Sequence, residues 1–277
     1  MQRIFNYSFI LTLALALMAF QCGKKPEDFP MGYMRNGLEL EVTPITVGES
    51  EFIVQPPDGM PTIRSVAWTG NHLWALTRIN SDGEQRLMRI DPTNGNVIFS
   101  IEPSQNVYGL DYANGLLWDM RSPSYNTNTY LNSFNQNTGA YLGAWNYDTG
   151  EDAFLANSFI CWAEDSYYMH GEYNCNGSVR CRGIYRFDEE GQILDSFTGL
   201  YMLDLVYDGE YFWSNEGDGY ILKLDSNLDA VEVYQVSDLE QFGPVYNSGN
   251  ADMQLEYIEG HLWIVDRWNR FYKTELE

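Results

Sequence analysis

Five polar residues recur at one position of an internal pattern, each three residues after a tryptophan. The tryptophans are Trp74, Trp118, Trp162, Trp213 and Trp263, and the polar residues are Thr77, Arg121, Asp165, Glu216 and Asp266. Calcium prefers oxygen ligands such as carboxylates, and a cationic ligand can stack on aromatic rings. We therefore regard Arg121, Asp165, Glu216, Asp266 and the loop residue Trp268 as a candidate face for a ligand or a calcium-like ion. The alternative is that these are solvated strand ends, partly neutralised by Arg121 and Arg267.

Catalytic constellations are sparse. The only histidines are His72, His170 and His261, which argues against a histidine-dependent triad or a multi-histidine metal site. Three acidic residues fall on the predicted innermost strands and have two interpretations: they line a channel, or they accept hydrogen bonds from backbone amides of the neighbouring repeat. These residues are Asp111, Asp204 and Glu256. We predict no catalytic residue and no cofactor other than the calcium-like ion.

The tryptophans mark the repeat that must position these residues. They are 44, 44, 51 and 50 residues apart, and apolar or aromatic residues align at fixed offsets before each of them. Turns between the first two strands are predicted at 69–71, 114–115, 208–209 and 259–260, with a weaker one at 157–158 in the third copy. Third strands are predicted at 87–91, 131–135, 184–188 and 221–225, and fourth strands at 97–101, 141–145, 193–197 and 231–236. Four short strands per repeat of about 40–50 residues are typical of propeller blades, so the sequence predicts an all-β, five-bladed β-propeller.

The last copy ends after its third strand, at 270–274. The segment at 51–55 is predicted to supply the missing fourth strand and so to close the ring, which removes exposed sheet edges. One further strand is predicted at 38–47. Longer loops at 77–85, 119–129, 163–182 and 237–252 are expected on the face that carries the candidate residues.

The N-terminus has the features of an export signal. Arg3 precedes an uncharged apolar run at 10–20 that is too short to span a bilayer. Cys22 directly after such a run resembles the lipidation site of a bacterial lipoprotein, so we predict a signal peptide at 1–21, a lipid-anchored linker at 22–37 and a propeller domain at 38–277. A plain secretory signal or an uncleaved anchor are the other interpretations. More than one acyl chain anchors a protein stably, and Gly23 after the cysteine favours the outer membrane of the cell envelope.

The chain is strongly acidic, with a formal net charge of −23. Such a surface repels nucleic acid and anionic lipid headgroups, so we expect no nucleic-acid partner. Cys175 and Cys181 flank a short polar loop and are predicted to form a disulfide in an oxidising compartment. Cys161 lies in an apolar strand and is expected to be a buried thiol.

Residues 51–277 resemble the plant-type glutamine cyclotransferase (glutaminyl cyclase) family. The sequence QLEYIEGHLW at 254–263 is similar to that family's Asn-Glu-Leu-Glu-Tyr-x-x-Gly-x-Ile-Trp block, and DGEYFW at 208–213 is similar in the same way. The resemblance implies a five-bladed propeller closed by its N-terminal strand. Its catalytic motifs are not matched, because the family's active-site acid aligns with Tyr108, the first Asn of the block with Met253, and no Phe-Thr-Gln-Gly motif precedes Val66.

The sequence therefore favours a membrane-tethered propeller lipoprotein that binds a protein, a peptide or a small ligand. The alternative is an enzyme of the glutamine cyclotransferase or lactonase type that uses carboxylates at the channel mouth. A binding module is the preferred interpretation, since fold resemblance alone does not carry function.

Overall fold

The computed structural model describes residues 32–35, 38–57, 60, 62–78, 83–103, 107–121, 128–148, 153–174, 180–198, 202–217, 219–237 and 253–276. For residues 32–35, 38, 121, 128–129, 146–148, 153–158, 171–174, 180–182, 198 and 216–217 it describes the backbone alone. The described residues fall into two compact units, divided between Val42 and Thr43. They include no helix that is long and apolar enough to cross a membrane.

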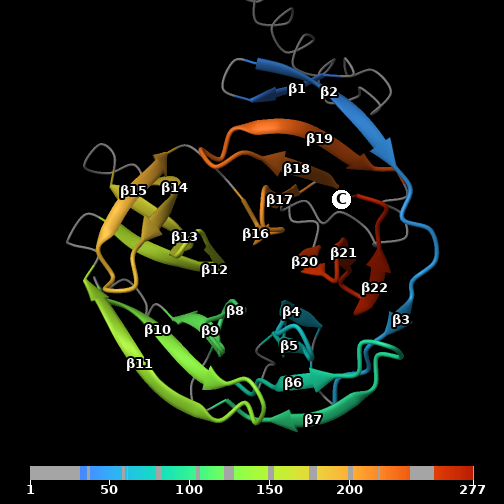
Figure 1. Ribbon diagram of the computed structural model, residues 1–277, viewed down its shortest axis with the longest axis vertical. Helices are drawn as coiled ribbons and strands as arrows, with labels where there is room; N and C mark the ends of the chain where they lie inside the picture. Colours follow the sequence, from blue (N-terminus) through green and yellow to red (C-terminus); the bar gives the residue numbers. More distant parts are fainter. Residues whose placement is uncertain are drawn as a thin grey trace, which may run out of the picture. The chain divides into compact units, whose positions relative to one another are not determined.

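The larger unit is a ring of five small antiparallel sheets, the blades of a propeller (Figure 1). The first blade contains β4 (Ile63–Trp68), β5 (Leu73–Thr77), β6 (Leu87–Ile90) and β7 (Val97–Ile101). The second contains β8 (Asp111–Ala113), β9 (Leu116–Arg121), β10 (Asn128–Asn135) and β11 (Tyr141–Asp148). The third contains β12 (Ala153–Ala163), β13 (Ser166–Asn174), β14 (Arg180–Phe187) and β15 (Ile193–Thr198).

The fourth blade contains β16 (Asp204–Tyr207), β17 (Phe212–Gly217), β18 (Tyr220–Leu224) and β19 (Ala230–Val236). The fifth contains β20 (Gln254–Ile258), β21 (His261–Val265), β22 (Arg270–Lys273) and β3 (Phe52–Ile53). The predicted five-bladed fold is confirmed, and every predicted third and fourth strand overlaps an observed one.

Strand β3 comes from the start of the propeller sequence and lies beside a strand from its end. Phe52 pairs with Phe271 and Ile53 with Arg270 in an antiparallel ladder. Next to it, the Glu51 N–H donates to the Phe271 carbonyl at 2.8 Å and the Val54 N–H donates to the Asn269 carbonyl at 2.9 Å. The fifth sheet is therefore four-stranded, like the first, second and third.

The third blade corrects the predicted alignment of the repeats. Cys161 pairs with Tyr168 as Asp111 pairs with Trp118, so the counterpart of the repeat tryptophan is Tyr168 and not Trp162. The predicted turn at 157–158 is also wrong, because β12 runs to Ala163 and turns at 164–165. This turn has no glycine, although both of its residues have positive φ angles of 49° and 57°, so neither a tryptophan nor a glycine marked the repeat here. Much of the loop predicted at 163–182 is strand, in β13 and β14.

The core lies between neighbouring blades. One cluster joins Trp74 and Leu76 of the first blade to Leu117 and Phe134 of the second, and Trp74, Trp118 and Trp213 are almost completely buried. The Trp74 indole N–H crosses to the Gln136 carbonyl at 2.9 Å. Aromatic side chains bury large apolar areas, so the repeat tryptophans are the residues that hold adjacent blades together.

The smaller unit contributes a hairpin of β1 (Gly32–Arg35) and the first half of β2 (Leu38–Ile45), in which Gly32 pairs with Glu41 and Arg35 with Leu38. The end of β2 belongs to the larger unit. There the Ser237 N–H donates to the Ile45 carbonyl at 2.9 Å, next to the outer strand of the fourth blade.

Candidate functional site

Polar side chains on the innermost strands link one blade to the next. In each case a backbone N–H of the following blade donates to a side-chain oxygen, and this occurs at four of the five junctions in the described part of the chain. The donors and acceptors are Leu110 N–H to Ser65 Oγ (3.0 Å), Leu255 N–H to Asp204 Oδ2 (2.7 Å), Trp162 N–H to Asp111 Oδ2, and Trp68 N–H to the Glu256 carboxylate. The inner-strand acids therefore accept hydrogen bonds from backbone amides of the neighbouring blade, which is one of the two roles that their positions allowed.

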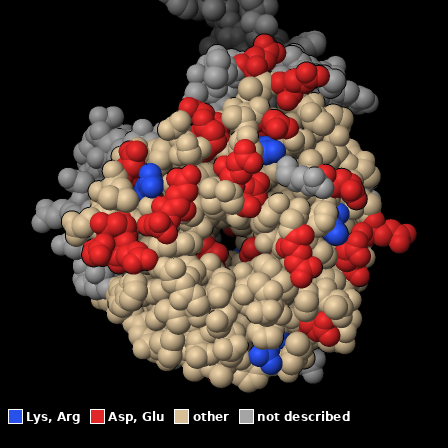
Figure 2. All heavy atoms as spheres, in the orientation of Figure 1, with Lys and Arg blue, Asp and Glu red and all other residues tan. Residues whose placement is uncertain are grey.

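Burial strongly perturbs these inner carboxylates. It raises the pKa of Asp111 and of Asp204 to about 7, and it raises the pKa of Glu256 well above its usual range. Repulsion from Asp111 and Asp204 raises the pKa of Glu256 further, because like charges close to one another disfavour ionisation. The face shown in Figure 2 has acidic side chains around a narrow opening at the centre of the ring.

Cys161 occupies the position in the third blade that Asp111 occupies in the second, since it pairs with Tyr168 as Asp111 pairs with Trp118. It is a buried free thiol, as its apolar strand predicted. Burial raises its pKa, and so do the nearby charges of Asp111, Asp204 and Glu256. Among the described side chains, no three of the His, Cys, Asp and Glu type lie close enough together to hold a metal ion.

A second cluster lies where the innermost strands of the first two blades begin. The register of β4 against β5 shifts between Ile63 and Ser65, so Arg64 is the extra residue of a β-bulge, a feature that redirects a side chain. Arg64 Nε donates to the Tyr108 carbonyl at 2.7 Å, and the guanidinium carbon lies 4.7 Å from the centre of the Tyr108 ring. Arg64 thus spans the junction between the two blades and stacks on an aromatic face.

The backbone that carries Tyr108 is fixed from both sides. Gln85, which is buried, donates to the Val107 carbonyl at 2.8 Å and accepts from the Val107 N–H at 2.9 Å. Asp119 Oδ1 accepts from the Tyr108 N–H at 2.7 Å and from the Gly109 N–H at 3.2 Å. Three successive N–H groups therefore have side-chain acceptors, which sets the position of the Tyr108 side chain.

Asp119 supports the backbone of the 107–109 segment. It is 0% exposed, and its second oxygen accepts from Asn132 Nδ2 at 2.9 Å. Burial raises its pKa to about 8, so the carboxyl is mostly neutral at pH 7. A group this enclosed cannot reach a ligand, and its hydrogen bonds order the 107–109 segment.

Gly109 allows the second and third blades to approach closely. A Cβ atom at this position would lie 3.0 Å from Phe159 Cα and 3.2 Å from the Ile160 N, both backbone atoms that cannot rotate away. We expect Gly109→Ala to lower the free energy of unfolding by about 1–3 kcal/mol through overpacking, measured by urea unfolding. Gly143→Ala is the matched control, because nothing lies within 4 Å of its Cβ position. Equal stability of the two variants would contradict the close approach.

The structure does not assemble the five polar residues of the repeat into one ligand-binding ring. Asp165 lies in the β12–β13 turn. Asp266 directly follows β21, at the opposite end of a blade, since a second strand runs antiparallel to the first. Arg121 and Glu216 are placed by their backbones, in β9 and β17, and their side chains lie outside the described residues, as do Cys22, Cys175 and the side chain of Cys181. The lipidation and disulfide assignments remain predictions.

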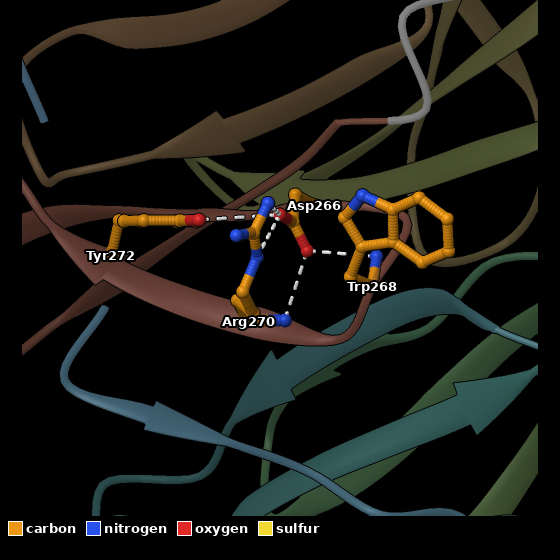
Figure 3. A network of polar contacts seen from close by, with 4 residues as sticks. All are labelled: Asp266, Trp268, Arg270 and Tyr272. Atoms are coloured by element: carbon orange, nitrogen blue, oxygen red, sulfur yellow. Dashed lines mark hydrogen bonds and ion pairs between the residues drawn. The ribbon is translucent and has the colours of Figure 1, made fainter. Parts of the chain in front are cut away.

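The Asp266 carboxylate accepts hydrogen bonds from residues of its own blade (Figure 3). Its Oδ1 accepts from the Trp268 N–H at 2.8 Å and the Arg270 N–H at 2.9 Å, and its Oδ2 accepts from Arg270 Nε at 2.6 Å and from the Tyr272 hydroxyl at 3.3 Å. Arg270 Nη2 forms an ion pair with the same oxygen at 2.6 Å. Trp268 is 53% exposed, and the Arg267 guanidinium lies 4.4 Å from its ring centre. Trp268 is therefore a surface aromatic beside a carboxylate already surrounded by donors.

Sequence reasoning missed Arg64 and Arg78. Arg78 follows β5, where its N–H donates to the Thr62 carbonyl at 2.8 Å, and its charge lowers the pKa of Arg64, after the larger effect of burial. The contact of Arg64 with Tyr108 joins residues 44 apart in the chain. No local sequence motif indicates such a contact. Aligning the two inner strands would, however, have placed Arg64 and Tyr108 on adjacent blades.

Comparison with known proteins supports the fold. No family profile matches the chain, and no curated protein matches it in sequence. Among solved structures it is similar to the glutaminyl cyclase of Myxococcus xanthus, at 13% identity over 81% of this chain and 97% of that one, with a TM-score of 0.56. It is also similar to BamB from Moraxella catarrhalis (10% identity, 81% and 94% covered, TM-score 0.36) and to the WD40 propeller domain of Doa1 (11% identity, 83% and 97% covered, TM-score 0.44). At 13% identity, the likeness to the glutaminyl cyclase shows a common fold alone.

Proposed function

We propose that this protein is a lipid-anchored propeller of the cell envelope that acts as a binding module, with its ligand contacting the Arg64–Tyr108 cluster at the mouth of the ring. The observation that carries the proposal is that the inner acidic side chains form hydrogen bonds within the fold. Asp111, Asp204 and Glu256 accept hydrogen bonds from neighbouring blades, and the position that the cyclotransferase resemblance assigns to an acid is Tyr108. An arginine stacked on a tyrosine supplies directed donors and an aromatic surface, which suit recognition more than proton transfer.

Anchoring is tested by replacing the predicted acylation site. We expect Cys22→Ala to move the protein from the membrane fraction to the soluble fraction, because the acyl chains would be its attachment. Cys161→Ala, which changes a buried thiol, should leave the protein in the membrane fraction. Labelling with a fatty-acid analogue checks the same point, and a Cys22→Ala protein that stays membrane-bound would refute lipid anchoring. Separation of the two membranes on a density gradient tests the proposed outer-membrane location.

Binding and catalysis are distinguished by assays on the full chain in detergent. Glutaminyl peptides and lactones, with and without calcium, are incubated with the protein and followed for loss of ammonia or ring opening. We expect no turnover. Turnover that Glu216→Gln or Asp266→Asn abolished, in variants that still melt cooperatively, would overturn the binding proposal in favour of an enzyme.

The binding site itself is tested with a panel of short peptides and small organic molecules, scored by the rise they cause in melting temperature. Ligands that stabilise the wild type should stabilise Tyr108→Ala less, since the ring and the stacked Arg64 would no longer meet them together. Trp268→Ala is the control on the candidate face of the fifth blade. A ligand whose effect depended on Trp268 and not on Tyr108 would move the site to that face.

A further inference from the structure

We infer that the outer edge of the second blade is a contact surface for a second copy of this chain. In the dimer, β11 (Tyr141–Asp148) of one copy pairs antiparallel with β11 of the other. This inference goes beyond the proposed ligand-binding function and does not depend on it.

Strand β11 is an open edge of its sheet. In the described part of the chain it pairs with β10 on one side, and no strand pairs with its other side. It has 8 residues, against 5 in β7 and 6 in β15, the outer strands of the first and third blades. An edge of this kind presents backbone N–H and C=O groups to which another strand can add.

The fourth blade shows that an outer edge of this propeller accepts a further strand. There β2 lies next to β19 in the same sheet, and at its end the Ser237 N–H donates to the Ile45 carbonyl at 2.9 Å. The chain itself therefore supplies the added strand in the fourth blade. The second blade has the same kind of edge without such a strand among the described residues.

The edge of the second blade carries no charge, unlike most of this acidic chain. No charged residue occurs between Arg121 and Asp148, although charged residues make up 20% of the sequence. Figure 2 shows no charged side chain over β10 and β11, at the lower left of the ring. Two copies that each have a formal net charge of −23 repel one another. The contact with the lowest electrostatic cost is therefore between their uncharged surfaces.

The other outer edges are less suited to this contact. Strand β15 contains Asp195 and follows Glu189 and Glu190, and β7 is shorter and ends next to Glu102. Charged side chains protect edge strands from pairing with other chains. The edge of β19 is already covered by β2, so β11 is the outer strand that is long, uncovered and uncharged along most of its length.

Large side chains on β11 are ordered by the core and still reach the surface. Tyr141, Leu142 and Trp145 are 36%, 54% and 47% exposed. The ring centre of Trp145 lies 4.7 Å from that of Trp118, and the ring centre of Tyr141 lies 5.8 Å from that of Phe134. Side chains that are already ordered lose little conformational entropy on association, and tryptophan and tyrosine are enriched among the residues that dominate contact energies.

The symmetry of the contact limits the assembly to two copies. An antiparallel pair of identical strands has a two-fold axis, so each copy uses the same surface and association ends at a dimer. A bulge at Leu142 interrupts the pairing with β10, which leaves 143–148 as the regular ladder for the partner. We expect the two-fold axis to pass between positions 145 and 146.

Cross-linking in intact cells tests the contact on the full chain. A photoreactive phenylalanine analogue is placed at position 144 or at position 196, and the cells are irradiated. Ala144 in β11 and Ser196 in β15 are both exposed, and each lies two residues after the bulge of its strand. We expect a product of twice the mass of the chain from position 144 and none from position 196. No product from position 144, equal products from both positions, or a product of another mass would overturn the inference.

Matched variants test the same edge by co-purification of two differently tagged copies made in one cell. Ala144→Glu and Leu142→Asp, present in both copies, should each lower co-purification ten-fold or more. Ser196→Glu and Leu194→Asp are the controls on the third blade and should leave it unchanged, since Leu142 and Leu194 are 54% and 53% exposed at equivalent positions. All four side chains are exposed, so the melting temperature should stay near that of the wild type, which separates loss of contact from loss of fold.

Two results would assign the copies or the surface differently. Co-purification that all four variants retain would show that the copies meet elsewhere, and the contact at β11 would be wrong. A chain that gives no cross-link, but whose Cys22→Ala form binds vesicles of neutral lipid unless Leu142 is changed to Asp, would assign this uncharged surface to the membrane. Either result overturns the inference and leaves the proposed ligand-binding function untouched.

Discussion

Between about pH 4 and pH 8 the free energy of unfolding should fall as the pH rises, and Asp119→Asn should remove the share of that fall that Asp119 contributes beside Asp111, Asp204 and Glu256. Burial raises the pKa of Asp119 from 3.8 to about 8 in the folded protein. Within this window the folded state keeps the proton and the unfolded state has lost it, so the unfolded state binds fewer protons and stability decreases with pH. One such group contributes up to about 1.4 kcal/mol per pH unit.

The measurement is urea unfolding of wild type and Asp119→Asn at pH 5 and at pH 8. We expect the difference between the two pH values to shrink by about 3–4 kcal/mol in the variant, because an amide does not titrate there. An asparagine keeps an oxygen for the Tyr108 and Gly109 N–H groups. Asn132 can turn its amide to accept from the new donor, as its Oδ1 has no hydrogen-bond partner in the described part of the protein.

Asp91→Asn is the control. The pKa of Asp91 is lowered, mainly by the hydrogen bond from the Thr93 hydroxyl. Its contribution is present above its unfolded value of 3.8 and is lost only as the pH falls through its lower folded value. Asp91→Asn should therefore change stability at pH 5 and pH 8 alike. A pH difference for Asp119→Asn that equalled that of the wild type would show that the buried carboxyl does not titrate as its surroundings imply.

Asp266→Ala should destabilise the protein strongly, and more than Gly109→Ala does. The substitution removes the acceptor of two turn N–H groups, of the Tyr272 hydroxyl and of the Arg270 guanidinium. Removing one partner of a buried ion pair costs about 3–5 kcal/mol, since the other is left without compensation. The expected result is a large drop in the urea midpoint and in the melting temperature.

Asp266→Asn separates charge from hydrogen bonding. It retains an oxygen for the Trp268 and Arg270 N–H groups and should lose less stability than the alanine variant. Calcium provides a second check on the role of Asp266. If this carboxylate serves its network alone, calcium should raise the melting temperature of the wild type and of Asp266→Asn equally, whereas a rise in the wild type only would return Asp266 to the metal hypothesis.

The fold was accessible from the sequence because its signals are repeated. Tryptophans at the core position and glycine-containing turns occur in four of the five blades. Trp74, Trp118 and Trp213 are buried against the next blade, and Trp263 is partly buried there. The third blade was misaligned because Tyr168 fills the tryptophan position and the turn before it reaches positive φ without glycine. A tyrosine buries nearly the same apolar area, so packing tolerates a change that pattern matching does not.

The site was less accessible because its contacts are between blades. Whether Asp266 faces a ligand or its own turn depends on side-chain direction, which its offset from Trp263 does not encode. Arg64 reaches Tyr108 because of a bulge between Ile63 and Ser65. A single residue inserted into a strand ladder cannot be recognised from the amino-acid sequence pattern. The inner acids were correctly placed on inner strands, but their role as acceptors required the neighbouring backbone.

The pairing of β3 with β22 has a consequence for the time course of folding. The Ile63 N–H donates to Asn269 Oδ1 at 2.7 Å across 206 residues of chain, next to the paired strands at 52–53 and 270–273. Closing so long a loop slows folding, because chain entropy is lost before the contact forms. Strand β3 is synthesised early and its partner β22 late, so β3 stays unpaired until β22 has been made, and in that time it can pair with the β22 edge of a second copy. The fifth blade is completed only after β22 has been made and has paired with β3. At high protein concentration, β3 is therefore the strand that we expect two copies to exchange first.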